Sequence, residues 1–127
     1  MGGRAAHSGG NFEYGISAIG ELAHKILAMH ALTSSEPGIT VNVGLVKGGQ
    51  SVNTTAPSAE GHIDVRYVGH AQRASALAAL QAIVDRATIP GTTGRLTLMA
   101  KFLPLASSPR SQALFACYPR GCGRGRP

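Results

Sequence analysis

The chain has 127 residues, which is enough for one domain with one hydrophobic core. Hydrophobic residues make up 43% of it and aromatic residues 5%, with no Trp, so the core is expected to be aliphatic. No apolar run is long enough to cross a bilayer and no secretory signal is recognisable, so we expect a cytoplasmic protein with no membrane partner.

The net charge of +6 is concentrated near the C-terminus. Four arginines and no acidic residue follow Leu105, which leaves eight basic and six acidic residues, or +2, for the first 104 positions. The excess charge therefore belongs to a tail, and we expect no nucleic-acid partner. We divide the chain into a domain at 1–105 and a Gly/Arg/Pro-rich tail at 106–127 that is either disordered or non-native.

A helix is predicted at 14–32, after a short first strand at 3–8. One apolar face of this helix should lie against the core. This face consists of Ile16, Ile19, Ala23, Ile26 and Leu27. Glu21 and Lys25 would lie away from it as an i,i+4 pair.

Leu22 and Met29 form a second apolar flank on the same helix. In a two-layer domain this flank would be half exposed. We therefore expect it to be a surface for contact with another subunit.

Two strands are predicted at 39–45 and 62–67, where apolar and polar residues alternate. A second helix follows at 70–88 and a last strand at 95–102. This order predicts an α+β fold of the ferredoxin-like kind (β-α-β-β-α-β). It would be a two-layer sandwich, with a four-stranded antiparallel sheet and both helices on one face.

Two stretches carry recognisable motifs. The first is Gly3-Arg4-Ala5-Ala6-His7-Ser8-Gly9, and the second runs from Thr40-Val41-Asn42-Val43-Gly44 through Gly48-Gly49, Asn53 and Pro57 to Asp64-Val65-Arg66-Tyr67. Together they resemble the dimerisation, or lid, domain of the zinc-dependent exopeptidases and amidohydrolases. That family includes glutamate carboxypeptidase, aminoacylase and acetylornithine deacetylase, and the resemblance covers about 3–102.

The resemblance implies roles for three residues. His7 would reach the metal site of the partner subunit and stabilise an oxyanion there as a catalytic residue. Asn53 would contact the substrate across the dimer, and Arg66 would bind the substrate carboxylate with its planar guanidinium. From the residues alone, Asn53 could instead close an Asx-turn. Arg66 could likewise form an ordinary surface ion pair with Asp64.

No metal site is expected in this chain. His62 and Asp64 lack a third ligand, and Cys117 and Cys122 have no matching histidines. The resemblance implies a dinuclear zinc centre in a separate domain of the parent enzyme. The chain alone would then bind no cofactor and would be inactive.

The implied function is that of a dimerisation-domain fragment of a metallopeptidase or amidohydrolase. The parent would hydrolyse N-acyl amino acids or peptides with a free terminal carboxylate, in the manner of a carboxypeptidase. The partner would be a second copy, paired through the edge strand at 39–45. The alternative is a ferredoxin-like module that binds nucleic acid or a small regulatory molecule, although its few aromatic residues are too scattered for base stacking.

Overall fold

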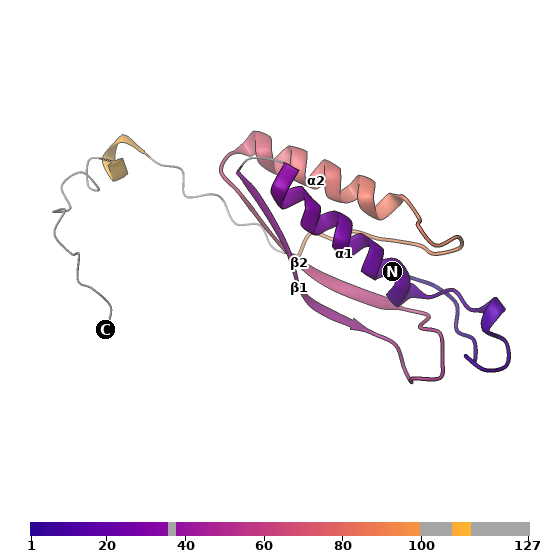
Figure 1. The fold of residues 1–127 in the computed structure, drawn as a ribbon. Helices are drawn as coiled ribbons and strands as arrows, with labels where there is room; N and C mark the ends of the chain where they lie inside the picture. Colours follow the sequence, from indigo (N-terminus) through magenta and orange to yellow (C-terminus); the bar gives the residue numbers. More distant parts are fainter. Residues whose placement is uncertain (36–37, 100–107, 113–127) are drawn as a thin grey trace, which may run out of the picture.

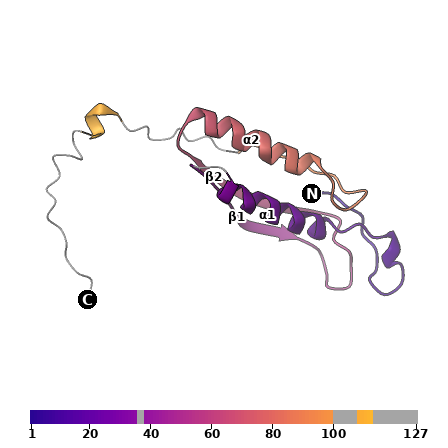
Figure 2. The ribbon, with the colours of Figure 1, turned by 45° about the horizontal axis from the view of Figure 1, so that its top comes forward.

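The computed structural model describes residues 1–35, 38–99 and 108–112. Its named elements, in chain order, are η1 (Phe12–Tyr14), α1 (Ala18–Ser35), β1 (Ile39–Gly48), β2 (Ala59–Tyr67) and α2 (His70–Asp85). The two strands form an antiparallel hairpin, and the two helices lie side by side against it (Figures 1 and 2). The predicted α+β class is confirmed.

The predicted four-stranded sheet is not observed, because the sheet in the described residues has two strands. Residues 3–8 pair only through isolated bridges, and residues 95–99 have no strand assignment, while 100–102 lie outside the described ranges. Gly2 is bridged to Ser58 on one side and to Thr93 on the other. Gly2 therefore lies between the start of β2 and the last segment, but single bridges at this position do not make either flanking segment a strand of the sheet. The ferredoxin-like arrangement is not confirmed.

The central hairpin agrees with the predicted alternation. β1 and β2 pair from Ile39 opposite Tyr67 to Gly48 opposite Ala59, with an irregularity between Val43 and Leu45. Residues of one face, such as Ile39, are buried under the helices, whereas those of the other face are mostly exposed. Both strands extend beyond their predicted bounds at the ends that join the connecting loop.

The helix α1 buries a different face from the predicted one. Its buried residues are Ala18, Glu21, Leu22, Lys25 and Met29, at helical spacing. The predicted core residues Ile19 and Leu27 are exposed, Leu27 to 72%. The flank expected to contact another subunit, which contains Leu22 and Met29, is instead core. Because apolar residues surround most of this helix, periodicity could not decide which face turns inward.

The second helix, α2, begins at its predicted residue, His70. It buries Ala76, Leu80 and Val84, with Ile83 partly buried beside them. These side chains pack with residues of α1 and β1 in one aliphatic cluster. The helix ends at Asp85, three residues before the predicted end at Thr88. None of the helices in the described ranges combines the length and the apolar character needed to span a membrane.

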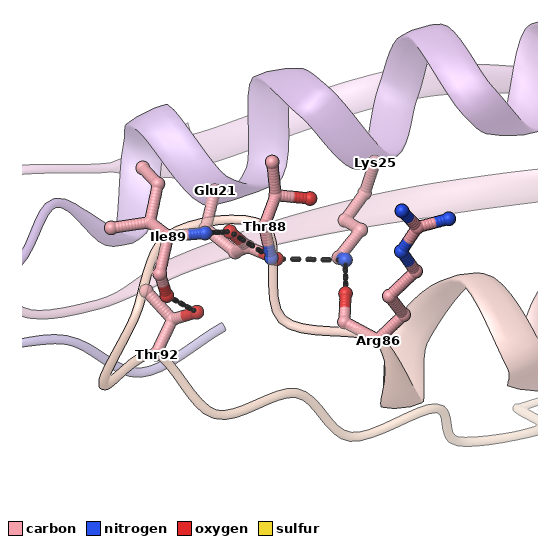
Figure 3. Close-up of polar contacts among 6 residues, drawn as sticks. All are labelled: Glu21, Lys25, Arg86, Thr88, Ile89 and Thr92. Carbon is pink, nitrogen blue, oxygen red and sulfur yellow. Dashed lines mark hydrogen bonds and ion pairs between the residues drawn. The ribbon is translucent and has the colours of Figure 1, made fainter.

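The rotation of α1 is set by a buried ion pair (Figure 3). Glu21 Oε1 lies 2.7 Å from Lys25 Nζ, and the two side chains are only 1% and 3% exposed. The Glu21 carboxylate accepts hydrogen bonds from Thr88 N at 3.0 Å and from Ile89 N at 2.6 Å. Lys25 Nζ donates to Arg86 O, at the C-terminal end of α2. The pair therefore ties the first half of α1 to the turn that follows α2.

This environment lowers the pKa of Glu21 from its ordinary 4.5 to about 2. Burial alone would raise the pKa of this carboxyl, but the hydrogen bonds from Lys25, Thr88 and Ile89 and the charge of Lys25 outweigh it. The carboxylate is therefore ionised in the folded state throughout the neutral range, and its charge is fully partnered.

Replacing Glu21 should destabilise the fold far more than replacing an exposed acid. Glu21→Gln leaves the Lys25 ammonium buried without a counter-charge, so the free energy of unfolding is expected to fall by about 3 kcal/mol in urea denaturation. Asp64→Asn breaks the exposed Asp64–Arg66 pair as a matched control, and its effect should stay below about 1 kcal/mol. Equal losses in the two variants would contradict the importance of the buried pair.

The same pair predicts an acid-dependent loss of stability. Between pH 4.5 and about 2 the unfolded chain takes up a proton at Glu21 that the folded chain does not, so the free energy of unfolding falls as the pH falls. The loss assigned to this one group is about 3 kcal/mol at 1.36 kcal/mol per pKa unit. Urea titrations at several pH values should show a flatter profile for Glu21→Gln than for the wild type, and parallel profiles would refute the assignment.

Candidate functional site

The N-terminal segment 2–8 is extended and lies against the loop between β1 and β2. Ser8 N donates to Asn53 O at 2.9 Å, and Thr55 N donates to Ala6 O at 2.8 Å. These bonds bring the two motifs of the sequence together at one end of the domain, although they are 46 residues apart when counted from His7 to Asn53.

On its other side the segment is held by the residues that lead into α1. Arg4 and Ile16 exchange two backbone hydrogen bonds of 2.9 Å each. Gly3 lies so close to this segment that a Cβ built on it would be 2.1 Å from Ile16 O and 3.0 Å from Ala18 N. Only a residue without a side chain fits here, which explains the glycine of the Gly-x-x-x-His motif in physical terms.

His7 is exposed and its ring is oriented by its own loop. Nδ1 accepts a hydrogen bond from Gly9 N at 3.1 Å. A neutral ring in this arrangement carries its proton on Nε2. His7 is also bridged to Thr54 through the backbone. The side chain therefore has a free N–H donor at the end of the ring that is not engaged by the loop.

Asn53 is exposed beside His7 and is oriented by a neighbour that the sequence analysis did not single out. Ser51 Oγ lies 2.8 Å from Asn53 Oδ1 and 2.9 Å from Thr54 Oγ1. Because the hydroxyl engages the amide oxygen, the NH₂ group of Asn53 remains a donor for another molecule. The short Ser51-Val52-Asn53 stretch, which lies between Gly49 and Pro57, is the sequence pattern that could have indicated this turn.

Arg66 does not join the other two residues. It lies opposite Thr40 in the register, seven residues along β2 from Ala59, so roughly 23 Å of strand separates it from the connecting loop. Its Nε donates to Asp64 Oδ2 at 3.0 Å on the exposed face of the hairpin. Within one chain the structure thus brings His7 and Asn53 together and leaves Arg66 at the other end of the sheet.

No group of three His, Cys, Asp or Glu side chains that could hold a metal ion occurs in the described ranges. His62 Nε2 lies 3.4 Å from Glu60 Oε1, and Asp64 is paired with Arg66. Cys117 and Cys122 lie outside the described residues. The described side chains therefore do not fit a dinuclear zinc centre.

A family model described as the peptidase dimerisation domain of the M20 type matches residues 1–92. This match covers well over half of the chain and includes His7, Asn53 and Arg66. The chain belongs to this family.

Solved structures of this kind support the assignment. An aminobenzoyl-glutamate utilization protein from Klebsiella pneumoniae is 30% identical, with a TM-score of 0.60 over 65% of this chain and 21% of its own length. Aminopeptidase PepT from Bacillus cereus is 26% identical, with a TM-score of 0.58 over 65% of this chain and 22% of its own. A tripeptidase from Staphylococcus aureus, at 24% identity, shares the fold with a TM-score of 0.57 over 65% of this chain and 21% of its own.

The dimerisation domain described here thus spans about a fifth of the length of these solved proteins. A comparison with curated proteins found no match. The family that this chain shares with the solved structures is a family of hydrolases, and its members include peptidases.

The position of His7 should depend on the glycine at position 3. Gly3→Ala forces a Cβ into Ile16 O, so the segment 2–8 must move away from α1. We expect a loss of about 1–3 kcal/mol in unfolding free energy and loss of amide-exchange protection at Thr55 and Ser8. Gly10→Ala is the matched control, because a Cβ at Gly10 meets nothing within 4 Å. Unchanged protection in Gly3→Ala would contradict this view of the site.

Proposed function

We propose that the chain acts as the dimerisation domain of a metal-dependent hydrolase and presents His7 and Asn53 to the catalytic centre of a neighbouring subunit. The observation that supports this best is the backbone pairing of Ser8 with Asn53 at 2.9 Å, which joins the two motifs at one exposed end. His7 would contribute the Nε2 proton to a developing oxyanion. Asn53 would contribute its amide N–H groups to the substrate.

The substrate class we propose is an N-acyl amino acid or a peptide with a free terminal carboxylate, as for a carboxypeptidase or amidohydrolase. Arg66 would bind that carboxylate, for which a planar guanidinium is well suited. Arg66 lies at the far end of β2, away from His7 and Asn53 of the same chain. It would therefore act in one active site, and His7 and Asn53 of the same chain would act in another. Each composite site would combine residues of two copies.

The catalytic metal would be held outside this chain. A dinuclear zinc centre is proposed for the parent enzyme, and the isolated chain would bind no catalytic metal and hydrolyse nothing. The functional unit would comprise 1–105, with 106–127 as a tail. We place the protein in the cytoplasm and propose no nucleic-acid or membrane partner.

Homodimerisation is supported by exposed apolar side chains on neighbouring elements. Ile19 and Leu27 are exposed on α1, and Leu45 and Val46 are exposed on β1. Exposed apolar groups gathered in this way are typical of interaction surfaces. This surface replaces the one predicted from Leu22 and Met29.

A domain exchange tests the proposed roles. The matching domain of the Klebsiella aminobenzoyl-glutamate utilization protein is replaced with residues 1–92 of this chain, and turnover of aminobenzoyl-glutamate is measured. His7→Ala in the chimera should lower kcat by about 10²–10³-fold, as for loss of an oxyanion donor. Arg66→Ala should mainly raise KM.

The exposed His24 on α1 provides the matched control, since His24→Ala removes an imidazole away from the proposed site. The isolated chain should show no hydrolysis. An active chimera that is insensitive to His7→Ala would overturn the role of His7.

A further inference from the structure

The edge of β1 that faces away from β2 is held by two side chains of α1. Val41 N donates to Thr33 Oγ1 at 2.9 Å, and the same hydroxyl donates to Val41 O at 3.2 Å. Val43 N donates to His30 Nε2 at 3.0 Å. Because β1 is an edge strand of the two-stranded sheet in the described residues, these main-chain groups would otherwise be unpaired. One helix therefore caps two alternate positions of the strand.

The His30 cap requires a neutral ring. A backbone N–H needs a lone pair on its acceptor, so Nε2 of His30 carries no proton while it binds Val43 N, and the ring proton is on Nδ1. His7 has the opposite arrangement, because its Nδ1 accepts from Gly9 N. Backbone N–H groups thus fix these two histidines in opposite tautomers.

Protonation of His30 removes the acceptor. Both nitrogens of an imidazolium ring carry protons, so Nε2–H would face the Val43 N–H and neither group could accept. The hydrogen bond must then break. Thr33 has no group that ionises in this range, so the cap on Val41 persists. Histidine side chains ordinarily change their charge between about pH 5 and pH 8, above the acid range in which Glu21 acts.

The charged groups of the surrounding elements do not hold a protonated ring at the strand. On α1 the residues one turn away are uncharged, and Glu21, His24 and Lys25 lie at least five residues away. β1 and β2 turn Lys47 and the charged side chains from Glu60 to Arg66 to the face that the helices do not cover. The remaining ionisable groups are Tyr67 on β2 and His70, Arg73 and Asp85 on α2. In the part of the chain that the structure describes, no carboxylate forms an ion pair with His30.

We propose that His30 is a pH-sensitive cap of the β1 edge. In its neutral form the ring holds Val43 N and links the second half of α1 to the strand. When the ring takes up a proton, the link at Val43 is lost and the link at Val41 remains. Val43 adjoins the irregularity before Leu45, where the ladder is already interrupted, so the edge loosens at this point first. The cap is independent of the role proposed for His7.

Amide exchange of the full chain, followed residue by residue between about pH 8 and pH 5, tests this proposal. Each exchange rate is compared with that of an unstructured amide at the same pH. The protection of the Val43 amide should fall about three- to tenfold on acidification, the contribution of one hydrogen bond. The protection of the Val41 amide should stay constant, because its partner does not titrate. Equal changes at the two amides would overturn the proposal.

Two variants assign the pH dependence to one ring. His30→Gln provides an amide oxygen that can accept from Val43 N and has no proton to take up in this range, so the Val43 protection should become independent of pH. His24→Ala is the matched control, since it removes an exposed imidazole from the same helix and should keep the wild-type response. A Val43 response that survives in His30→Gln contradicts the assignment.

Nitrogen NMR of the histidine rings gives an independent measurement on the wild-type chain. At about pH 8 the ring proton of His30 should be on Nδ1 and that of His7 on Nε2. A His30 ring with its proton on Nε2 overturns the proposal whatever the result for His7, because such a ring cannot accept from Val43 N.

Discussion

A buried carboxylate on α1 holds the end of α2. Glu21 accepts backbone hydrogen bonds from two residues of the turn after α2. Lys25 donates a hydrogen bond to the backbone carbonyl of Arg86, at the C-terminal end of that helix. A charge in this position is stable only because each of its partners is present. Since the turn at 88–89 meets one specific point on α1, the rotation of that helix is fixed. The choice of buried face follows from this contact, and with it the choice of exposed apolar flank.

That rotation links the core to the proposed interface. With Glu21 and Lys25 turned inward, Leu22 and Met29 join the core and Ile19 and Leu27 turn outward. The outward flank then lies beside β1, where His30 and Thr33 cap part of the edge. One helix therefore supplies the core, the protection of the sheet edge and an apolar surface for association.

The end of the domain that carries His7 is built differently, from backbone contacts rather than from a packed core. The segment 2–8 is held by hydrogen bonds on both sides, and a close approach at Gly3 leaves no room for a side chain. This arrangement orients His7 and Asn53 as hydrogen-bond donors while both stay exposed. Exposed donors of this kind are the basis of the role that we propose for His7 and Asn53 at a neighbouring subunit.

The sequence by itself determined the family and the central hairpin, because motif spacing and alternation are local properties of the chain. It also offered the Asp64–Arg66 pair, whose partners share one strand face, as the alternative to a substrate-binding role for Arg66. It did not determine which face of α1 is buried, since an i,i+4 pair looks the same in solvent and in a core. Tertiary structure decided this, as it decided that Arg66 lies far from His7 and that, in the described residues, the predicted first and last strands pair only through isolated bridges. These features depend on contacts between residues distant in the chain, such as Glu21 with Thr88 and Gly2 with Thr93, which no local pattern encodes.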